Sequence, residues 1–194
     1  MRYVLLVILA GVAGLAFVNH QSGSTTSREY SAIASAIARR PVEVHCPSFM
    51  KSLISVDGES GKVEFDANGR PANHADLSAD TCSALGDFTK LVRKKSFGCI
   101  SNDSCSGDVD KVVVALHTLT HESYHLAGYE DETASECFAI QTDAYTATRL
   151  GASSRVARAI AHYYLESQYR LTSSDYHSPE CRPGGRLDLG RGWP

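Results

Sequence analysis

The 194-residue sequence lacks the basic excess that is typical of nucleic-acid-binding proteins. Lysine and arginine number 19 against 22 aspartates and glutamates, and the formal net charge is −3. The sequence also has no glycine-rich phosphate loop, no block of like charges and no internal repeat. These absences argue against a nucleic-acid partner. Hydrophobic residues make up 43% and charged residues 21%, which is ordinary for one globular domain of this length.

The sequence has only one long apolar run, and that run is short for a membrane span. Residues 4–18 are apolar, whereas a spanning helix needs about 20 residues. One positive charge precedes the run and polar residues follow it, which is the pattern of a secretory signal. We expect residues 1–21 to be a signal peptide or, alternatively, a membrane anchor, and 22–27 to be a linker. Residues 28–194 should then form one extracytoplasmic domain, secreted or anchored to the outer face of the cytoplasmic membrane.

The six cysteines never occur in the Cys-x-x-Cys spacing of cysteine zinc sites. All six lie in the part predicted to be exported, where an oxidising environment lets disulfides persist. We therefore expect a disulfide-stabilised domain, although six cysteines permit fifteen pairings and the sequence does not choose among them. Cys99 and Cys105 form the easiest pair to predict, because they bracket a short turn-rich stretch. We expect the tail, residues 172–194, to be a loop held on the body by Cys181.

Hydrophobic periodicity predicts an α+β domain that is mainly helical. Residues 42–44 and 62–65 alternate as short strands do, and the Asn68-Gly69 pair predicts a small β-hairpin over 62–77. Apolar residues at helical spacing, together with capping residues, predict five helices. These are expected at 28–40, 78–94, 108–127, 131–150 and 153–171.

The segment His121-Glu122-Ser123-Tyr124-His125 has the H-E-x-x-H pattern within a predicted helix. Residues four apart lie on one face of a helix, so both imidazoles can reach one metal ion. Zinc suits such a site, because it accepts imidazole nitrogens and carboxylate oxygens and keeps one position for water in catalytic sites. Glu122 should lie beside that face and act as general base toward the zinc-bound water.

A third metal ligand is expected from the residues that follow this pattern. Gly128 permits a sharp turn, after which the next helix would return antiparallel to the first and form an αα-hairpin. Glu132 and Glu136 lie one turn apart on that helix and could both face the metal. Asp131, just before the helix, is a further carboxylate within reach.

Two motifs, HESYH at 121–125 and ETASECFA at 132–139, together resemble the gluzincin zinc metallopeptidases. The second motif of that family is E-x-x-x-D, whereas this chain has glutamate at the last position. The resemblance implies that Glu132 ligates zinc. It also implies that Glu136 orients one of the two histidines through a hydrogen bond.

Residues 121–131 also resemble the metzincins and their aspartate-bearing relatives, in which the residue at the position of Asp131 is the third ligand. Those proteins need a methionine turn beneath the metal, and the only two methionines here both lie upstream of the pattern. We therefore take Glu132 as the first choice of third ligand, Glu136 as the second and Asp131 as the third.

These observations predict a small zinc-dependent hydrolase, a metallopeptidase that acts on a peptide or protein substrate. The alternative is an exported zinc-site module that binds a partner or an envelope component without peptidase activity. It would hold if Glu132 and Glu136 both bound the ion and closed the site. A third hypothesis is a disulfide-stapled structural domain without metal.

The remaining histidines have no metal-ligand spacing in the sequence. His117 lies four residues before the first histidine of the pattern. We expect it either to contact a metal ligand without binding the metal itself or to be an ordinary core residue. His45, His74 and His177 stand alone and are interpreted as ordinary surface or loop residues.

Overall fold

The fold is described here from a computed structural model. The structure describes residues 27–47, 60–94, 96–102, 105 and 107–194. The predicted signal peptide or anchor, residues 1–21, and the first five residues of the predicted linker lie outside them.

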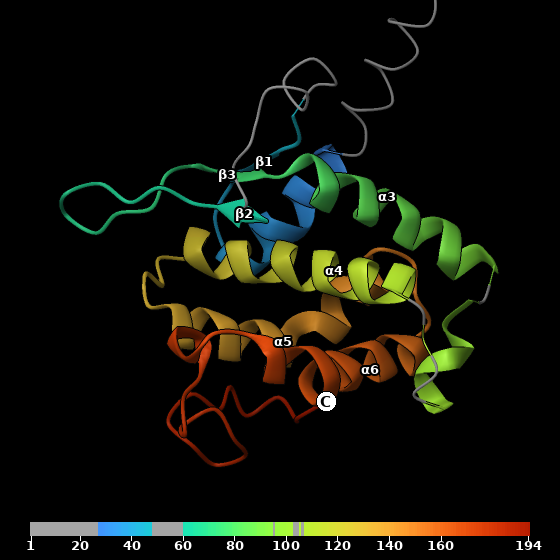
Figure 1. The fold of residues 1–194 in the computed structure, drawn as a ribbon. Helices are drawn as coiled ribbons and strands as arrows, with labels where there is room; N and C mark the ends of the chain where they lie inside the picture. Colours follow the sequence, from blue (N-terminus) through green and yellow to red (C-terminus); the bar gives the residue numbers. More distant parts are fainter. Residues whose placement is uncertain (1–26, 48–59, 95, 103–104, 106) are drawn as a thin grey trace, which may run out of the picture.

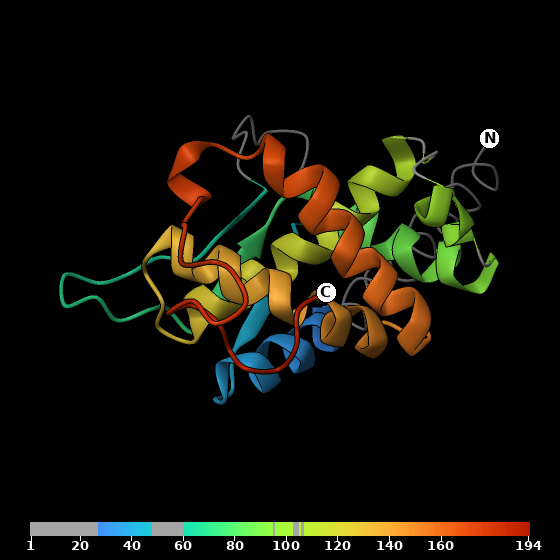
Figure 2. The ribbon, with the colours of Figure 1, turned by 90° about the horizontal axis from the view of Figure 1, so that it is seen from below.

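The fold is mainly helical, as predicted, with one small sheet at its edge (Figure 1). Helix α4 (Gly107–Leu126) lies between α3 (Ala79–Lys94) and α5 (Glu132–Arg149), and α6 (Ser154–Tyr163) packs against α5. In the second view α6 crosses α5 at an angle (Figure 2). The short helical segments are η1 (Ser96–Asn102), η2 (Tyr164–Gln168), η3 (Tyr169–Leu171) and η4 (Ser174–Tyr176), and residues 27–38 are also helical.

The sheet has the strand order β1-β3-β2, with β1 (Glu43–His45), β2 (Gly61–Lys62) and β3 (His74–Leu77). Strands β1 and β3 are parallel, whereas β2 and β3 are antiparallel. Together β2 and β3 form the predicted hairpin, whose turn contains Gly69 at a φ of 70°. The hairpin tip projects away from the helices (Figure 1).

The core lies where the buried faces of the helices meet. On α4 the apolar residues face every direction, and Val113, Leu116 and Leu119 are completely buried. They pack in one cluster with Ile33 from the first described helix and Phe88 from α3. After its first turn α4 is buried on nearly all sides, which explains why residues 112–116 show no polar face.

The helix ends follow the predicted capping residues. The side chain of Asp131 accepts a hydrogen bond from the Ala134 N–H at 2.7 Å and caps the start of α5. Gly128 and Gly151 follow the ends of α4 and α5 with positive φ angles of 102° and 98°. The predicted helix at 153–171 differs in detail, because α6 is followed by a π-helical turn and then a 3₁₀ turn.

All six cysteines are paired, and the predicted Cys99–Cys105 bridge is confirmed. Cys46, just after β1, is joined to Cys82 of α3. Cys137 of α5 is joined to Cys181, which holds the C-terminal segment on the helical body as predicted. Three disulfides point to an oxidising, extracytoplasmic environment.

No helix in the described part of the chain is both long enough and apolar enough to cross a membrane. The segment predicted as a membrane anchor, residues 4–18, lies outside that part.

Candidate metal centre

The αα-hairpin of α4 and α5 brings the predicted ligands together. His121 and His125 lie one turn apart near the end of α4, and their exposed fractions are only 7% and 5%. After the turn at Gly128 the chain returns, and α5 starts with Glu132. We call His121, His125 and Glu132 the buried centre.

Three ligand atoms converge in the buried centre. Nε2 of His121 lies 2.9 Å from Nε2 of His125 and 3.0 Å from Oε2 of Glu132, and the remaining distance, between Nε2 of His125 and that oxygen, is 3.3 Å. Ligand atoms around a tetrahedral zinc ion lie about 3.3 Å apart. The three atoms are therefore spaced, within a few tenths of an ångström, as three ligands of one zinc ion would be.

The hydrogen bonds of the opposite ring nitrogens orient both imidazoles. Nδ1 of His125 lies 2.6 Å from the carbonyl oxygen of Tyr129, and Nδ1 of His121 lies 3.0 Å from Oε2 of Glu136. Both partners are acceptors, so each Nδ1 carries the hydrogen and each neutral Nε2 presents a lone pair. Two lone pairs and a carboxylate oxygen then face one another, and they need a cation between them.

In the metal-free protein a proton takes the place of that cation. Burial by itself would lower the pKa of His121, but hydrogen bonds with Glu132 and Glu136 outweigh it and raise this pKa to about 9. Hydrogen bonds from His121 and His125 lower the pKa of Glu132 to about 2. Any metal that binds here must therefore displace a proton at neutral pH.

Glu136 lies behind His121 rather than beside Glu132. Its Oε2 accepts from Nδ1 of His121 and, at 2.8 Å, from Nε2 of His117, while its Oε1 accepts from the Tyr164 hydroxyl at 2.8 Å. Burial would raise the pKa of Glu136, but the cationic ring of His117 and these hydrogen bonds lower it well below its usual range. Its hydrogen-bond partners are thus Nδ1 of His121, His117 and Tyr164, and none of them is a ligand atom of the buried centre.

His117 links Glu136 to a carboxylate that the sequence analysis missed. Nδ1 of His117 lies 2.8 Å from Oδ2 of the fully buried Asp143, and its ring stacks on Tyr164 with 3.6 Å between centroids. Both nitrogens of His117 face carboxylates, whose charges favour the protonated ring, while burial raises the pKa of Asp143 itself. Asp143 lies seven residues after Glu136, two turns along the same face of α5, and this spacing was a signal that could have identified it.

Asp131, the third candidate ligand, serves as a helix cap instead. Its Oδ1 accepts from the N–H of Ala134 and from the hydroxyl of Thr133 at 2.6 Å. It belongs to none of the possible metal-ligand groups in the described residues.

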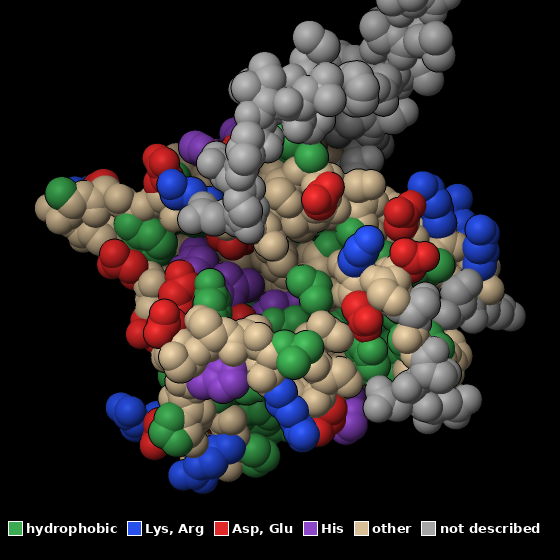
Figure 3. All heavy atoms as spheres, viewed as in Figure 1, with side chains coloured by type: hydrophobic (Ala, Val, Ile, Leu, Met, Phe, Trp, Pro, Cys, Tyr) green, Lys and Arg blue, Asp and Glu red, His purple; other side chains and the backbone are tan. Residues whose placement is uncertain are grey.

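Glu122, the predicted general base, is 94% buried at the wall of a cleft of about 720 Å³ that also contains the buried centre. A Cβ atom on Gly61 would lie only 2.8 Å from Cγ and Oε1 of Glu122, so β2 passes directly over this carboxylate. A side chain at that position of β2 would push Glu122 aside. In the space-filling view histidine side chains are visible inside a hollow, with acidic side chains along one side of it (Figure 3).

The protonated histidines give the metal-free protein a defined pH dependence of stability. Burial would lower the pKa of His117, but Glu136 and Asp143 outweigh it and raise this pKa to about 10, from 6.5 in the unfolded chain. A raised pKa stabilises the fold fully below the unfolded value, and this stabilisation is lost as pH rises through the folded value. His121 acts in the same direction.

In the presence of a chelator, the free energy of unfolding should therefore fall by several kcal/mol, up to about 7 kcal/mol, between pH 6.5 and pH 10. Denaturant unfolding at several pH values measures it. A stability that stays constant or rises over this range would show that the two histidines are neutral in the folded protein.

Comparisons with protein-family models, with curated proteins and with solved structures found no match to this chain. The function is therefore argued from the geometry and chemistry of the site itself.

Proposed function

We propose that this protein is a zinc-dependent metallopeptidase, in which the buried centre holds the metal. Nε2 of His121, Nε2 of His125 and Oε2 of Glu132 would be its ligands. The observation that carries the proposal is the convergence of three ligand atoms, from two imidazoles and one carboxylate, at 2.9 to 3.3 Å from one another. Zinc is favoured because two imidazoles and one carboxylate, with one position open, are a ligand set of catalytic zinc sites.

When bound, zinc would polarise the carbonyl of the substrate and acidify a water molecule at the open position. The carboxylate of Glu122 would then accept a proton from that water and return it to the nitrogen of the leaving amine. Glu122 suits this task because it follows His121 directly and lines the same cleft. The backbone of β2 at Gly61 limits where its carboxylate can move.

The edge of the sheet supports a peptide as the substrate. In the described sheet β2 pairs only with β3, and residues 61–63 line the cleft. An extended peptide could therefore add to β2 through backbone hydrogen bonds while its scissile bond lies over the buried centre.

The position of Glu136 supports the enzyme over the binding module. The module requires Glu136 to bind the ion together with Glu132 and to close the site. Both oxygens of Glu136 already accept hydrogen bonds from residues behind His121. In our proposal Glu136 orients His121, which is also the role that the gluzincin resemblance implies for it.

The proposal includes an extracytoplasmic location, secreted or held by residues 4–18, which the three disulfides support. The two locations differ in one measurable respect. A secreted form would have lost the leader, whereas an anchored form would retain it.

Metal analysis combined with a peptide assay tests the proposed function. The purified full chain should retain zinc through dialysis and should cleave members of a library of fluorogenic peptides. A chelator should abolish cleavage, and Zn²⁺ should restore it whereas Mg²⁺ should not. Cleavage that survives complete removal of zinc, or a dialysed protein that holds none, would contradict the proposal.

A further inference from the structure

The outer face of β1 and β3 collects four polar side chains of complementary kinds. Glu43 and His45 alternate along β1, and His74 and Asp76 alternate along β3, while the residues between them are buried. The parallel register pairs Glu43 with His74 and His45 with Asp76. Because side chains two apart point to the same face of a strand, all four lie on the solvent side of the sheet.

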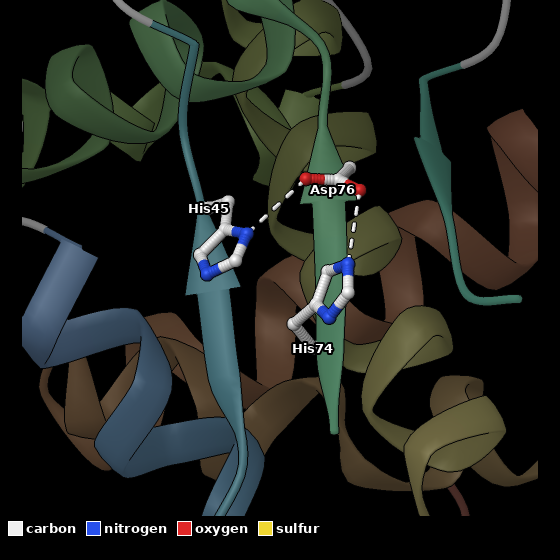
Figure 4. A group of neighbouring side chains, drawn as sticks. All are labelled: His45, His74 and Asp76. Atoms are coloured by element: carbon white, nitrogen blue, oxygen red, sulfur yellow. Dashed lines mark ion pairs between the residues drawn. The ribbon is translucent and has the colours of Figure 1, made fainter. Parts of the chain in front are cut away.

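Three of these residues direct ligand atoms toward one another (Figure 4). Nδ1 of His45 lies 3.3 Å from Oδ1 of Asp76, and Nε2 of His74 lies 3.4 Å from Oδ2 of the same carboxylate. The two rings are stacked, with centroids 4.7 Å apart and an interplanar angle of 21°. One ligand atom from each of the three residues lies within 4.8 Å of the others. We call His45, His74 and Asp76 the outer-face group.

The chemistry of the outer-face group fits a borderline divalent cation. Two imidazole nitrogens and a carboxylate are ligands that zinc, nickel and copper accept. The remaining nitrogen of His45, Nε2, lies 3.0 Å from Oε2 of Glu43, which can fix the ring orientation. The three side chains are partly exposed, so they can adjust around an ion without disturbing the core.

We infer that the outer-face group is a second metal site, which takes Zn²⁺ or a similar borderline cation through His45, His74 and Asp76. The bound ion joins two strands that are neighbours in space but distant in the sequence. Water completes its coordination, because the site is open to solvent. His45 and His74, which the sequence suggested were ordinary surface residues, thus have a shared role, and the inference involves no residue of the buried centre.

Zinc binding to a His45→Gln/His74→Gln double variant tests this inference. Chelator-stripped wild type and variant are dialysed against the same micromolar free Zn²⁺, and zinc per chain is measured. The double variant should bind one equivalent less than wild type. A matched control is His162→Gln on α6, which removes an exposed histidine outside every possible metal-ligand group in the described residues, and it should bind as much zinc as wild type.

The inference is tested by the difference in bound zinc per chain between wild type and double variant, and not by the total amount of zinc that either protein binds. If the buried centre binds no zinc, the totals of wild type and variant fall together and the difference of one equivalent remains. Equal zinc binding by wild type and double variant overturns the inference. Circular dichroism in chelator checks that the variant is folded, and Asp76→Asn, which keeps both histidines, should weaken binding at the same site.

Discussion

A Glu122→Gln variant is expected to keep its zinc and to lose peptide hydrolysis by a factor of about 10²–10⁴. The amide of glutamine has nearly the shape of the carboxylate but cannot accept the proton of the attacking water. Glu122 is not among the three converging ligands, so its replacement leaves the buried centre intact. The loss should appear in kcat rather than in KM, because proton transfer contributes to the transition state and not to the binding of the substrate.

The control for this variant is Glu130→Gln, the same chemical change at an exposed residue that lines the same cleft. It should hydrolyse the peptide at nearly the wild-type rate. Zinc content and thermal stability are measured for both variants. A Glu122→Gln protein that is folded, holds zinc and remains as active as the control would remove Glu122 from the mechanism.

The sequence predicts the elements of this fold well because the residues that begin and end each helix or turn act on the neighbouring backbone. Gly128 ends α4 and Asp131 caps α5 within a few residues of the expected positions, since each signal depends only on neighbouring backbone. The same holds for the hairpin around Gly69 and for the short Cys99–Cys105 bridge. In each case the contacting residues are close in the chain.

Contacts between segments that are distant in the chain cannot be predicted from local sequence signals. Asp143 reaches His117 only because α5 packs antiparallel to α4 in one particular register. Tyr164 reaches Glu136 only because the chain continues from α6 into a π-helical turn. Neither the register nor the turn has a strong periodic signal, so the contacts of Asp143 and Tyr164 emerge only from the structure, whereas supporting roles for Glu136 and His117 are already expected from the sequence.

The outer-face group illustrates the same limit on strands. Alternation in β1 and β3 is visible in the sequence, and it indicates which residues share a face of each strand. It does not indicate that these two strands are parallel neighbours, which is the fact that brings His45 next to Asp76. Pairing between distant strands depends on the whole core, whereas alternation is local.

Glutamine variants of Glu132 and Glu136 are expected to differ in which property they impair more, zinc affinity for Glu132→Gln and stability for Glu136→Gln. Glu132 is half exposed and would be a direct ligand, so Glu132→Gln should cost less stability in the metal-free protein than Glu136→Gln does. Its zinc affinity should fall by more than the roughly 100-fold that marks the loss of a supporting hydrogen bond. Glu136→Gln removes one of the two carboxylates that face the buried cationic ring of His117, and should lower the free energy of unfolding by up to about 3–5 kcal/mol.

The zinc affinity of Glu136→Gln should decrease by only about 10–100-fold, since His121 loses its orienting partner but keeps its Nε2. Competition with a chromophoric chelator measures the affinities, and denaturant unfolding in the absence of metal measures the stabilities. The Glu130→Gln control should change neither quantity. Should Glu136→Gln lose as much affinity as Glu132→Gln without losing stability, Glu136 would be a ligand and the site would be closed. The protein would then bind zinc for a purpose other than hydrolysis, because no position on the ion would remain for water.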